Sequence, residues 1–325
     1  MSDHHNNKHD LLIIGIGEAG SSITLDIIKK INSEYLLINS KKNSKYITKN
    51  IIIDTPSWLN PPIEKIRESF LYELDNIYEI INKYNKIILI GNLASKLGIA
   101  IMPILAKYLS SNNREIFTFV IMPFGFEKNK IFHSGVSLSF INNYSNSTII
   151  VDNESFLKNN PEISIPECFR ITNNSIKDII IASYRKGFPE DLNVISTCKE
   201  SFRIDEAFAK SFAMSKISDS EEIEKTFIYI YPANEKIDKI ESIIKTVEHL
   251  RDETDYEINI IPSNDSFTKI HLVNKTNNIV LFSAYDPLSQ FISAENFLDF
   301  EPETNRNIKE ISHIKNIEMF AINQK

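Results

Sequence analysis

The residues in this sequence best suited to bind a ligand are three glycines near its start. They lie in the segment Gly15-Ile16-Gly17-Glu18-Ala19-Gly20, directly after the apolar run Leu11–Ile14. Between a strand and a helix, this spacing brings backbone amides close to a phosphate, and the helix dipole favours the anion. The same glycines also allow tight packing of a helix on a strand. A dinucleotide site further needs an acid at the end of the next strand. The sequence has Asn39-Ser40-Lys41 there, so a phosphate site and close packing remain the two interpretations.

Short apolar runs alternate with longer helical patterns around this loop, which is typical of βαβ units on a parallel sheet. The runs are apolar on both faces, as strands covered on both sides must be. Ile23, Ile27 and Ile31 recur every four residues and predict a first helix with one apolar stripe. We expect strands over Leu11–Ile16, Tyr35–Ile38, Ile51–Ile53, Lys86–Ile90, Ile116–Ile121 and Thr148–Val151.

Prolines and glycines indicate where the longer helices begin and end. Pro61 and Pro62 are expected to open a helix that runs toward Tyr84, because first-turn amides have no helical partner. Its inward residues are Ile63, Ile66, Phe70, Leu74 and Ile77. A further helix is expected after Gly98. A long helix follows Pro166, continues to about Lys186 and is ended by Gly187 and Pro189.

After the long helix the pattern changes to that of a smaller α/β unit. Helices are expected over Arg203–Lys216 and Glu235–Arg251, and strands over Phe227–Tyr231, Glu257–Ile261, Lys269–Val273 and Ile279–Ser283. The polar segment Asn274–Asn278 predicts an antiparallel hairpin of the last two strands. The predicted fold class is α/β, with a Rossmann-like parallel-sheet domain, a long central helix, and a second smaller domain with a mixed sheet. We expect a disordered tail over 1–10, the first domain over 11–166, the central helix over 167–188, the second domain over 189–300 and a short tail or docking segment over 301–325.

Composition narrows the class of protein. The 325 residues carry a net charge of −7, and 42% of them are hydrophobic, which is typical of a globular chain and unlike a nucleic-acid-binding surface. Cys168 and Cys198 form no C-x-x-C pair, which favours a reducing compartment and argues against a zinc site. Apolar stretches stop short of the ~18 residues that a membrane span needs, and the polar Met1–Asp10 segment is unlike a signal peptide. We therefore expect a cytoplasmic protein with no nucleic-acid partner, no metal and no direct membrane insertion.

Several further segments carry a resemblance to a known family. Pro123-Phe124-Gly125-Phe126-Glu127 resembles the P-F-x-F-E signature of FtsZ, and Ile149–Leu157 looks like that family's strand and loop ending in Asn-x-x-Phe/Leu-Leu. Phe169-Arg170-Ile171-Thr172-Asn173 is similar to the F-x-x-x-N motif on which FtsZ proteins hold the guanine base. Asn39-Ser40 stands where they have Asn-Thr. Over roughly residues 11–285 the chain thus resembles the tubulin/FtsZ superfamily, as a divergent FtsZ-like protein of archaeal or bacterial type.

The resemblance implies a GTP-binding domain and a second domain joined by the central helix. It also implies head-to-tail stacking, in which the loop after the long helix of one subunit brings acids to the nucleotide site of the next. The partner would be a second copy of this chain or another FtsZ-like paralogue. The residues that match the family's nucleotide contacts are Gly15, Gly17, Gly20, Asn39, Gly98, Glu127, Asn153, Phe169 and Asn173.

The phosphate-binding positions depart from the family's pattern. The glycine-rich loop G-G-G-T-G-T-G is here Ala94-Ser95-Lys96-Leu97-Gly98-Ile99-Ala100, which keeps only Gly98. A β-carbon blocks the approach of backbone to phosphate oxygens, and the point charge of Lys96 cannot replace a cradle of amides. Glu18 replaces a glycine and Lys41 replaces an aspartate. A carboxylate beside a triphosphate is repulsive, so these changes predict weakened binding.

The positions of the acids needed for hydrolysis depart as well. The loop that the family supplies to its neighbour reads Asn193–Cys198, and its two acidic positions are Ile195 and Cys198. Neither side chain orients water as a carboxylate does. Because a general acid–base group typically contributes about 10²–10⁴-fold, we expect little hydrolysis. A short shift of the loop's register would instead let Glu190 or Asp191 take this role.

Two interpretations of the pocket stay open. The chain binds GTP or GDP weakly without turnover, or it has a pseudo-site in which Glu18 pairs with Lys41 or Lys96 and the surviving motif residues serve the fold. The leading hypothesis is a cytoskeletal or scaffold protein that does not hydrolyse GTP and acts through head-to-tail self-association or partner contacts. The alternatives are an active GTP-hydrolysing filament protein of cell division or cell shape, and a monomeric adaptor.

Overall fold

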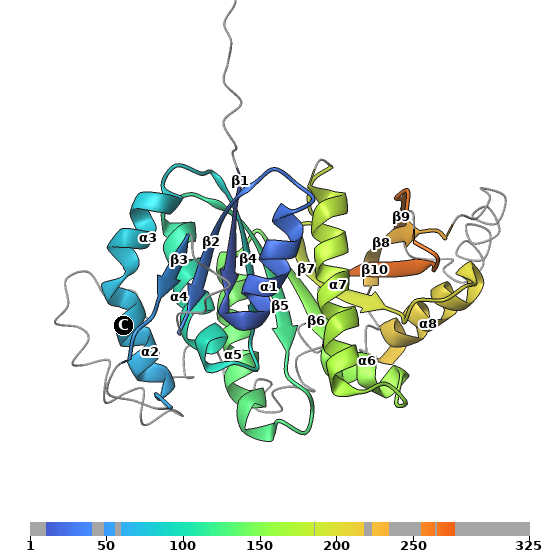
Figure 1. Ribbon diagram of the computed structural model, residues 1–325, viewed down its shortest axis with the longest axis horizontal. Helices are drawn as coiled ribbons and strands as arrows, with labels where there is room; N and C mark the ends of the chain where they lie inside the picture. Colours follow the sequence, from blue (N-terminus) through green and yellow to red (C-terminus); the bar gives the residue numbers. More distant parts are fainter. Residues whose placement is uncertain are drawn as a thin grey trace, which may run out of the picture.

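The computed structural model describes residues 11–40, 49–55, 60–184, 186–217, 223–233, 255–263 and 265–276. These residues form a ten-stranded sheet with helices on both faces (Figure 1). The strand order is β3-β2-β1-β4-β5-β6-β7-β10-β8-β9. The predictions made for residues 1–10, Lys41, Glu235–Arg251, Ile279–Ser283 and 301–325 lie outside the described residues.

The first seven strands are all paired in parallel, and the first six of them match the expected apolar runs. Successive side chains of one strand enter two different cores: Leu12 and Ile14 pack with the helices of one face, Leu11 and Ile13 with those of the other. The parallel strands are β1 (Leu11–Ile16), β2 (Glu34–Asn39), β3 (Asn50–Ile52), β4 (Lys86–Asn92), β5 (Glu115–Met122), β6 (Ser147–Asp152) and β7 (Asp191–Thr197).

The helices of the first part confirm the expected alternation with one difference. The stretch that begins at Pro61 is two helices, because the backbone N–H of Glu73 bonds to the carbonyl of Phe70 and tightens the turn there. Phe70 and Ile77 are fully buried on either side of this break. The helices are α1 (Gly17–Ile28), α2 (Ile63–Tyr72), α3 (Leu74–Ile81), α4 (Lys96–Ser111), α5 (Lys128–Tyr144) and α6 (Asn153–Asn159).

The long central helix is α7 (Ile165–Ser183), which lies beside α1 over one face of the sheet (Figure 1). Ser164 caps it, accepting from the N–H of Glu167 at 3.4 Å, and Pro166 occupies its first turn. Gly187, with φ +98°, donates its N–H to the carbonyl of Ser183 and ends the helical run. The expected helix and its stop signals are therefore confirmed.

The remaining strands extend the same sheet and make it mixed. They are β8 (Ile223–Tyr231), β9 (Asp255–Ile260) and β10 (Lys269–Thr276). Strand β10 is antiparallel to both β7 and β8, and β9 is parallel to β8. Helix α8 (Ile204–Ile217) packs on β7 and β10 around buried Ala207 and Phe208. Strand β7 thus joins the parallel part to the C-terminal strands. Among the described helices, none has the length and apolar character to cross a membrane.

Candidate nucleotide site

The candidate residues gather at the carboxyl edge of the parallel strands. The loops after β1, β4, β5 and β6 all leave the sheet at this edge, because parallel strands end on the same side. The N-terminal half of α7 reaches the same place, where the Cys168 thiol contacts the carbonyl of Asn153. A β-carbon at Gly17 would lie 3.7 Å from Leu97 and 3.9 Å from the Ser95 hydroxyl, so the first two loops are neighbours.

Close packing explains most of the glycines in these loops. A β-carbon at Gly20 would lie 2.3 Å from the carbonyl oxygen of Ile90, and one at Gly98 would lie 2.1 Å from that of Asn92. Gly17 differs because its φ is +72°, which side chains other than glycine rarely adopt. A β-carbon at Gly15 would meet the carbonyl oxygen of Gly20 at 2.6 Å. The spacing of these glycines therefore has a packing reason that is independent of any ligand.

In the loop after β4, four backbone amides already have acceptors within the loop. The N–H of Ala94 donates to the Asn92 side chain at 2.7 Å, and the N–H of Gly98 donates to the Ser95 hydroxyl at 3.0 Å. The amides of Ser95 and Ile99 bond to the carbonyls of Asn92 and Ser95. Ser95 is the N-cap of α4, and its hydroxyl also donates to the Asn92 carbonyl. A phosphate at this loop would have to displace these bonds.

The two charged replacements of this pocket do not pair with each other. Glu18 is exposed in the first turn of α1. The Lys96 ammonium donates to the Asn60 side chain and to the Pro61 carbonyl, both at 3.0 Å. In the described part of the chain, no ion pair joins Glu18 to Lys96. This half of the pseudo-site interpretation is therefore wrong, and its Lys41 half lies outside the described residues.

Four of the predicted ribose and base residues have partners inside the protein. Asn39 bonds to Ser21 and Asn50. The Asn153 amide donates to the Met122 carbonyl at 3.2 Å, and its oxygen accepts from the Thr172 hydroxyl at 2.9 Å. Glu127 accepts from the N–H of Phe124 and pairs with Lys130 at 2.6 Å. The ring of Phe169 packs edge-on against Phe124, 5.3 Å between centroids. These contacts give each residue a role in the fold.

Asn173 has a different environment. Its side-chain oxygen is buried and has no hydrogen-bond partner among the residues that the structure describes. The same holds for the hydroxyl of Thr24 on α1, the helix that packs against α7. A buried acceptor without a partner is unfavourable, and a ligand N–H would satisfy it. Asn173 therefore has a free acceptor at this edge of the sheet, whereas four amides of the loop after β4 already have partners.

The start of α1 is the remaining place for an anion. Its N-cap is Ile16, and within the described residues no side chain caps it. First-turn amides and the helix dipole favour negative charge there. The exposed carboxylate of Glu18 in the same turn opposes a second anion. The helix dipole and the Glu18 carboxylate thus act on an anion here in opposite directions.

The segment expected to be a loop offered to a neighbour is strand β7. Ile195 is 0% exposed and packs against α7, and Cys198 is 2% exposed and packs under α8. The expectation of a loop here is wrong because Leu192 to Thr197 are buried on both faces of the sheet, polar residues included. The β-branched content of the segment was the available signal.

Two acids of the same region are exposed at the opposite edge of the sheet. Glu190 and Asp191 lie at the start of β7, where the N–H of Asp191 bonds to the carbonyl of Asn146. The Asp191 carboxylate pairs with Lys275 at 2.9 Å. The structure thus presents these acids, and not positions 195 and 198, on the side away from the glycine loops.

Neither cysteine at the site is suited to act as a nucleophile. Both are free and buried. Burial, with the nearby carboxylate of Asp152, raises the pKa of the Cys168 thiol to about 12. Burial also raises the pKa of Cys198. Thiols held in the protonated form are poor nucleophiles and poor metal ligands.

The tubulin/FtsZ fold is defined by three features of this structure. They are a parallel sheet with a glycine loop after its first strand, a long helix across that sheet, and antiparallel strands beyond the helix. The chain is similar to an FtsZ from M. jannaschii, described as an empty dimer, at 15% identity over 83% of this chain and 89% of that chain, with a TM-score of 0.64. It is similar to CetZ from Methanosaeta thermophila strain DSM 6194 at 16% identity over 94% and 96%, with a TM-score of 0.63. CetZ2 from Haloferax volcanii, described as a GTPγS-bound protofilament, has 13% identity over 92% and 99% and a TM-score of 0.54.

These likenesses show the fold, and the expected fold class is confirmed. No sequence-family model matches the chain, and no curated protein does. The residues of the site therefore have to be interpreted from their own contacts.

Proposed function

We propose that this protein is an FtsZ-like cytoskeletal or scaffold protein of the cytoplasm that stacks head to tail. In this proposal it binds guanine nucleotide weakly or not at all, and it does not hydrolyse GTP effectively. The fold supports a cytoskeletal role, and neighbours described as a dimer and as a protofilament support self-association. A partner that is another FtsZ-like paralogue would use the same surfaces.

The observation that carries the proposal is the loop after β4. Its amides at Ala94 and Gly98 are bonded to the side chains of Asn92 and Ser95. Exchanging one hydrogen bond for another yields little net free energy, since each typically contributes about 0.5–1.5 kcal/mol. A phosphate therefore gains little from these two amides and also meets the Glu18 carboxylate. The burial of Ile195 and Cys198 further supports the absence of hydrolysis.

A second candidate function is an active GTPase, and two observations favour it. The orphaned oxygen of Asn173 suits a base, and Glu190 and Asp191 are exposed at the far edge of the sheet. In a head-to-tail stack, an acid from that edge would face the next subunit's glycine loops. Its role would be to orient the attacking water while the nucleotide supplies the phosphoryl group.

Phosphate release with GTP at high protein concentration separates the two candidates. We expect release no faster than in a blank without protein, and sedimentation of assemblies with or without GTP. Sustained phosphate release would establish the active GTPase instead, provided that the double variant Glu190→Ala, Asp191→Ala abolishes it. Glu224→Ala is the matched control, because Glu224 also contacts Lys275 and should leave any turnover unchanged. A chain that stays monomeric under every condition would contradict self-association.

A further inference from the structure

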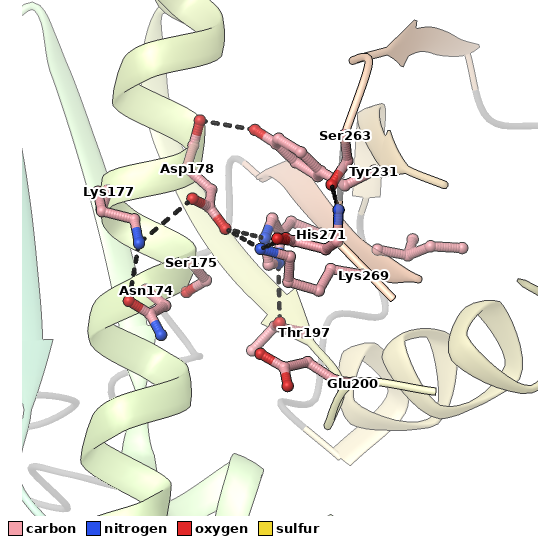
Figure 2. Close-up of polar contacts among 12 residues, drawn as sticks. Asn174, Ser175, Lys177, Asp178, Thr197, Glu200, Tyr231, Ser263, Lys269 and His271 are labelled. Carbon is pink, nitrogen blue, oxygen red and sulfur yellow. Dashed lines mark hydrogen bonds and ion pairs between the residues drawn. The ribbon is translucent and has the colours of Figure 1, made fainter. Parts of the chain in front are cut away.

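A buried cluster of charged groups lies between α7 and the C-terminal strands, on the side of α7 away from the candidate nucleotide site. Its centre is the Asp178 carboxylate of α7, which faces His271 and Lys269 of β10 (Figure 2). One carboxylate oxygen lies 3.5 Å from the His271 Nε2 and 3.4 Å from the Lys269 ammonium. Asp178 is 8% exposed and His271 is 2% exposed. These charges are therefore largely removed from water.

The cluster connects α7 to three strands. The other ring nitrogen of His271, Nδ1, lies 2.8 Å from the Thr197 hydroxyl of β7. The Tyr231 hydroxyl of β8 donates to the backbone carbonyl of Asp178 at 2.7 Å (Figure 2). Lys177 lies 3.7 Å from the Asp178 carboxylate, and Lys269 also pairs with Asp265. Asp178 thus contacts β10 through its carboxylate and β8 through its backbone carbonyl, and His271 extends the cluster to β7.

The order of hydroxyl, imidazole and carboxylate resembles a catalytic triad, but its burial excludes that role. Thr197 is 0% exposed, so no substrate can approach its hydroxyl. A triad also needs its nucleophile beside a cleft. The same groups are well suited to fix the relative position of two elements, because hydrogen bonds and ion pairs in a buried site are directional.

The carboxylate is held in its charged form. Burial alone would raise the pKa of Asp178, but the hydrogen bond and charge of His271, with Lys269 and Lys177, lower it to about 2. Removing one partner of such a cluster leaves the others buried without compensation, which is strongly unfavourable. The contact of α7 with the C-terminal strands therefore depends on charge as well as on the apolar packing of Val273 of β10 and Tyr229 of β8.

We propose that the Asp178–His271–Lys269 cluster is a latch that holds β8 and β10 against α7. When its charge balance is lost, these strands separate from α7 while the parallel sheet stays folded. The parallel strands keep their own ladders, and the apolar core on the face away from α7 contains no residue of β8 or β10. The inference does not depend on nucleotide binding or on self-association, so it stands apart from the proposed function.

Hydrogen exchange measured by mass spectrometry on the full chain tests the latch. Asp178→Asn should speed exchange in residues 223–231 and 269–276 by about tenfold or more, while residues 11–16 and 86–92 exchange as in the unmodified protein. Tyr229→Phe is the matched control. It removes a neutral bond between the same helix and β8, the 3.0 Å contact of Tyr229 with Ser183, and should change exchange no more than about threefold.

Two results would overturn the latch. The first is unchanged exchange in both C-terminal segments of Asp178→Asn. The second is an equal increase across β1 and β4, because the cluster would then contribute to global stability alone. If Asp178→Asn does not fold, Lys269→Met replaces it, since Lys269 is 17% exposed and its loss leaves the carboxylate with His271. The same two results decide the outcome for that variant.

Discussion

At the scale of single residues, Asp152 caps a helix although its burial disfavours the charged form of its carboxyl group. It is the N-cap of α6 and accepts from the backbone N–H groups of Glu154 at 2.8 Å and Ser155 at 3.1 Å. The Ser155 hydroxyl also donates to it. Burial nevertheless dominates and raises the pKa of Asp152 to about 6. The cap is thus a carboxyl group that binds a proton more tightly in the folded chain than in the unfolded one.

The sign of the resulting pH dependence is opposite to that of a salt-bridged aspartate. Between pH 4 and pH 6 the folded state keeps a proton that the unfolded state releases, so the contribution of Asp152 to stability falls as pH rises. Asp152→Asn stays neutral and keeps an acceptor for the cap. From pH 4 to pH 7, we expect the free energy of unfolding of Asp152→Asn to rise by about 2–3 kcal/mol relative to that of the unmodified protein. Urea unfolding at several pH values measures the difference.

Asp152→Ala is the control for this prediction. It is equally unable to titrate but lacks the acceptor, so it should be less stable than Asp152→Asn by about 1 kcal/mol at every pH. Other titrating groups affect all three proteins alike and cancel in the comparison. The prediction would be contradicted if the stability difference between Asp152→Asn and the unmodified chain did not change with pH, or if it decreased as pH rises.

At the scale of elements, the first turn of α4 competes with a ligand for the same backbone groups. The Ser95 hydroxyl caps the helix by accepting from the N–H of Gly98. Ser95→Ala should lower the free energy of unfolding by about 1 kcal/mol. It also frees that N–H, so affinity for GTP should rise or stay the same. Calorimetry with GTP, alongside urea unfolding, tests both expectations. Loss of affinity in Ser95→Ala would mean that the hydroxyl binds the nucleotide.

The elements could be predicted from the sequence where one physical signal dominated. Runs that are apolar on both faces identified the first six parallel strands, and Gly187 with Pro189 identified the end of α7. Strand β7 was not predicted, because buried polar residues such as Asn193 and Thr197 break its apolar pattern. The break at Glu73 has no sequence signal of its own. Phe70 and Ile77 enter one core on either side of it, as they would from one unbroken helix.

The candidate site was less predictable, because motif residues acquire their roles from neighbours that are distant in sequence. Asn39 meets Asn50 through the register of β2 with β3, and Asn153 meets Thr172 through the placement of α7. A serine ahead of an apolar helix does indicate an N-cap, so the role of Ser95 was within reach. The orphaned oxygen of Asn173 could not have been predicted from the residue type.

At the scale of the whole molecule, the two edges of the parallel sheet differ in character. The carboxyl edge exposes large apolar side chains in its loops, with Phe126 at 61% and Phe202 at 72% exposure. The ring of Phe126 is stacked on Phe124 at 5.0 Å, and ion pairs such as Glu127–Lys130 lie beside it. Exposed aromatic residues with a charged surround are typical of interface centres. The opposite edge exposes Glu190 and Asp191.

Head-to-tail stacking would bury the carboxyl edge of one subunit against the next, and Phe126 tests this directly. Phe126→Ser should raise the protein concentration needed for assembly by about tenfold or more, since buried aromatic anchors typically contribute 2 kcal/mol or more. Its free energy of unfolding should fall by no more than about 1 kcal/mol, because the side chain is largely exposed in the subunit and loses only its stacking on Phe124. Tyr72→Ser is the matched control: Tyr72 is 63% exposed on α2, at the flank of the molecule (Figure 1). Sedimentation that changes equally in both variants would place the contact surface elsewhere than at this edge.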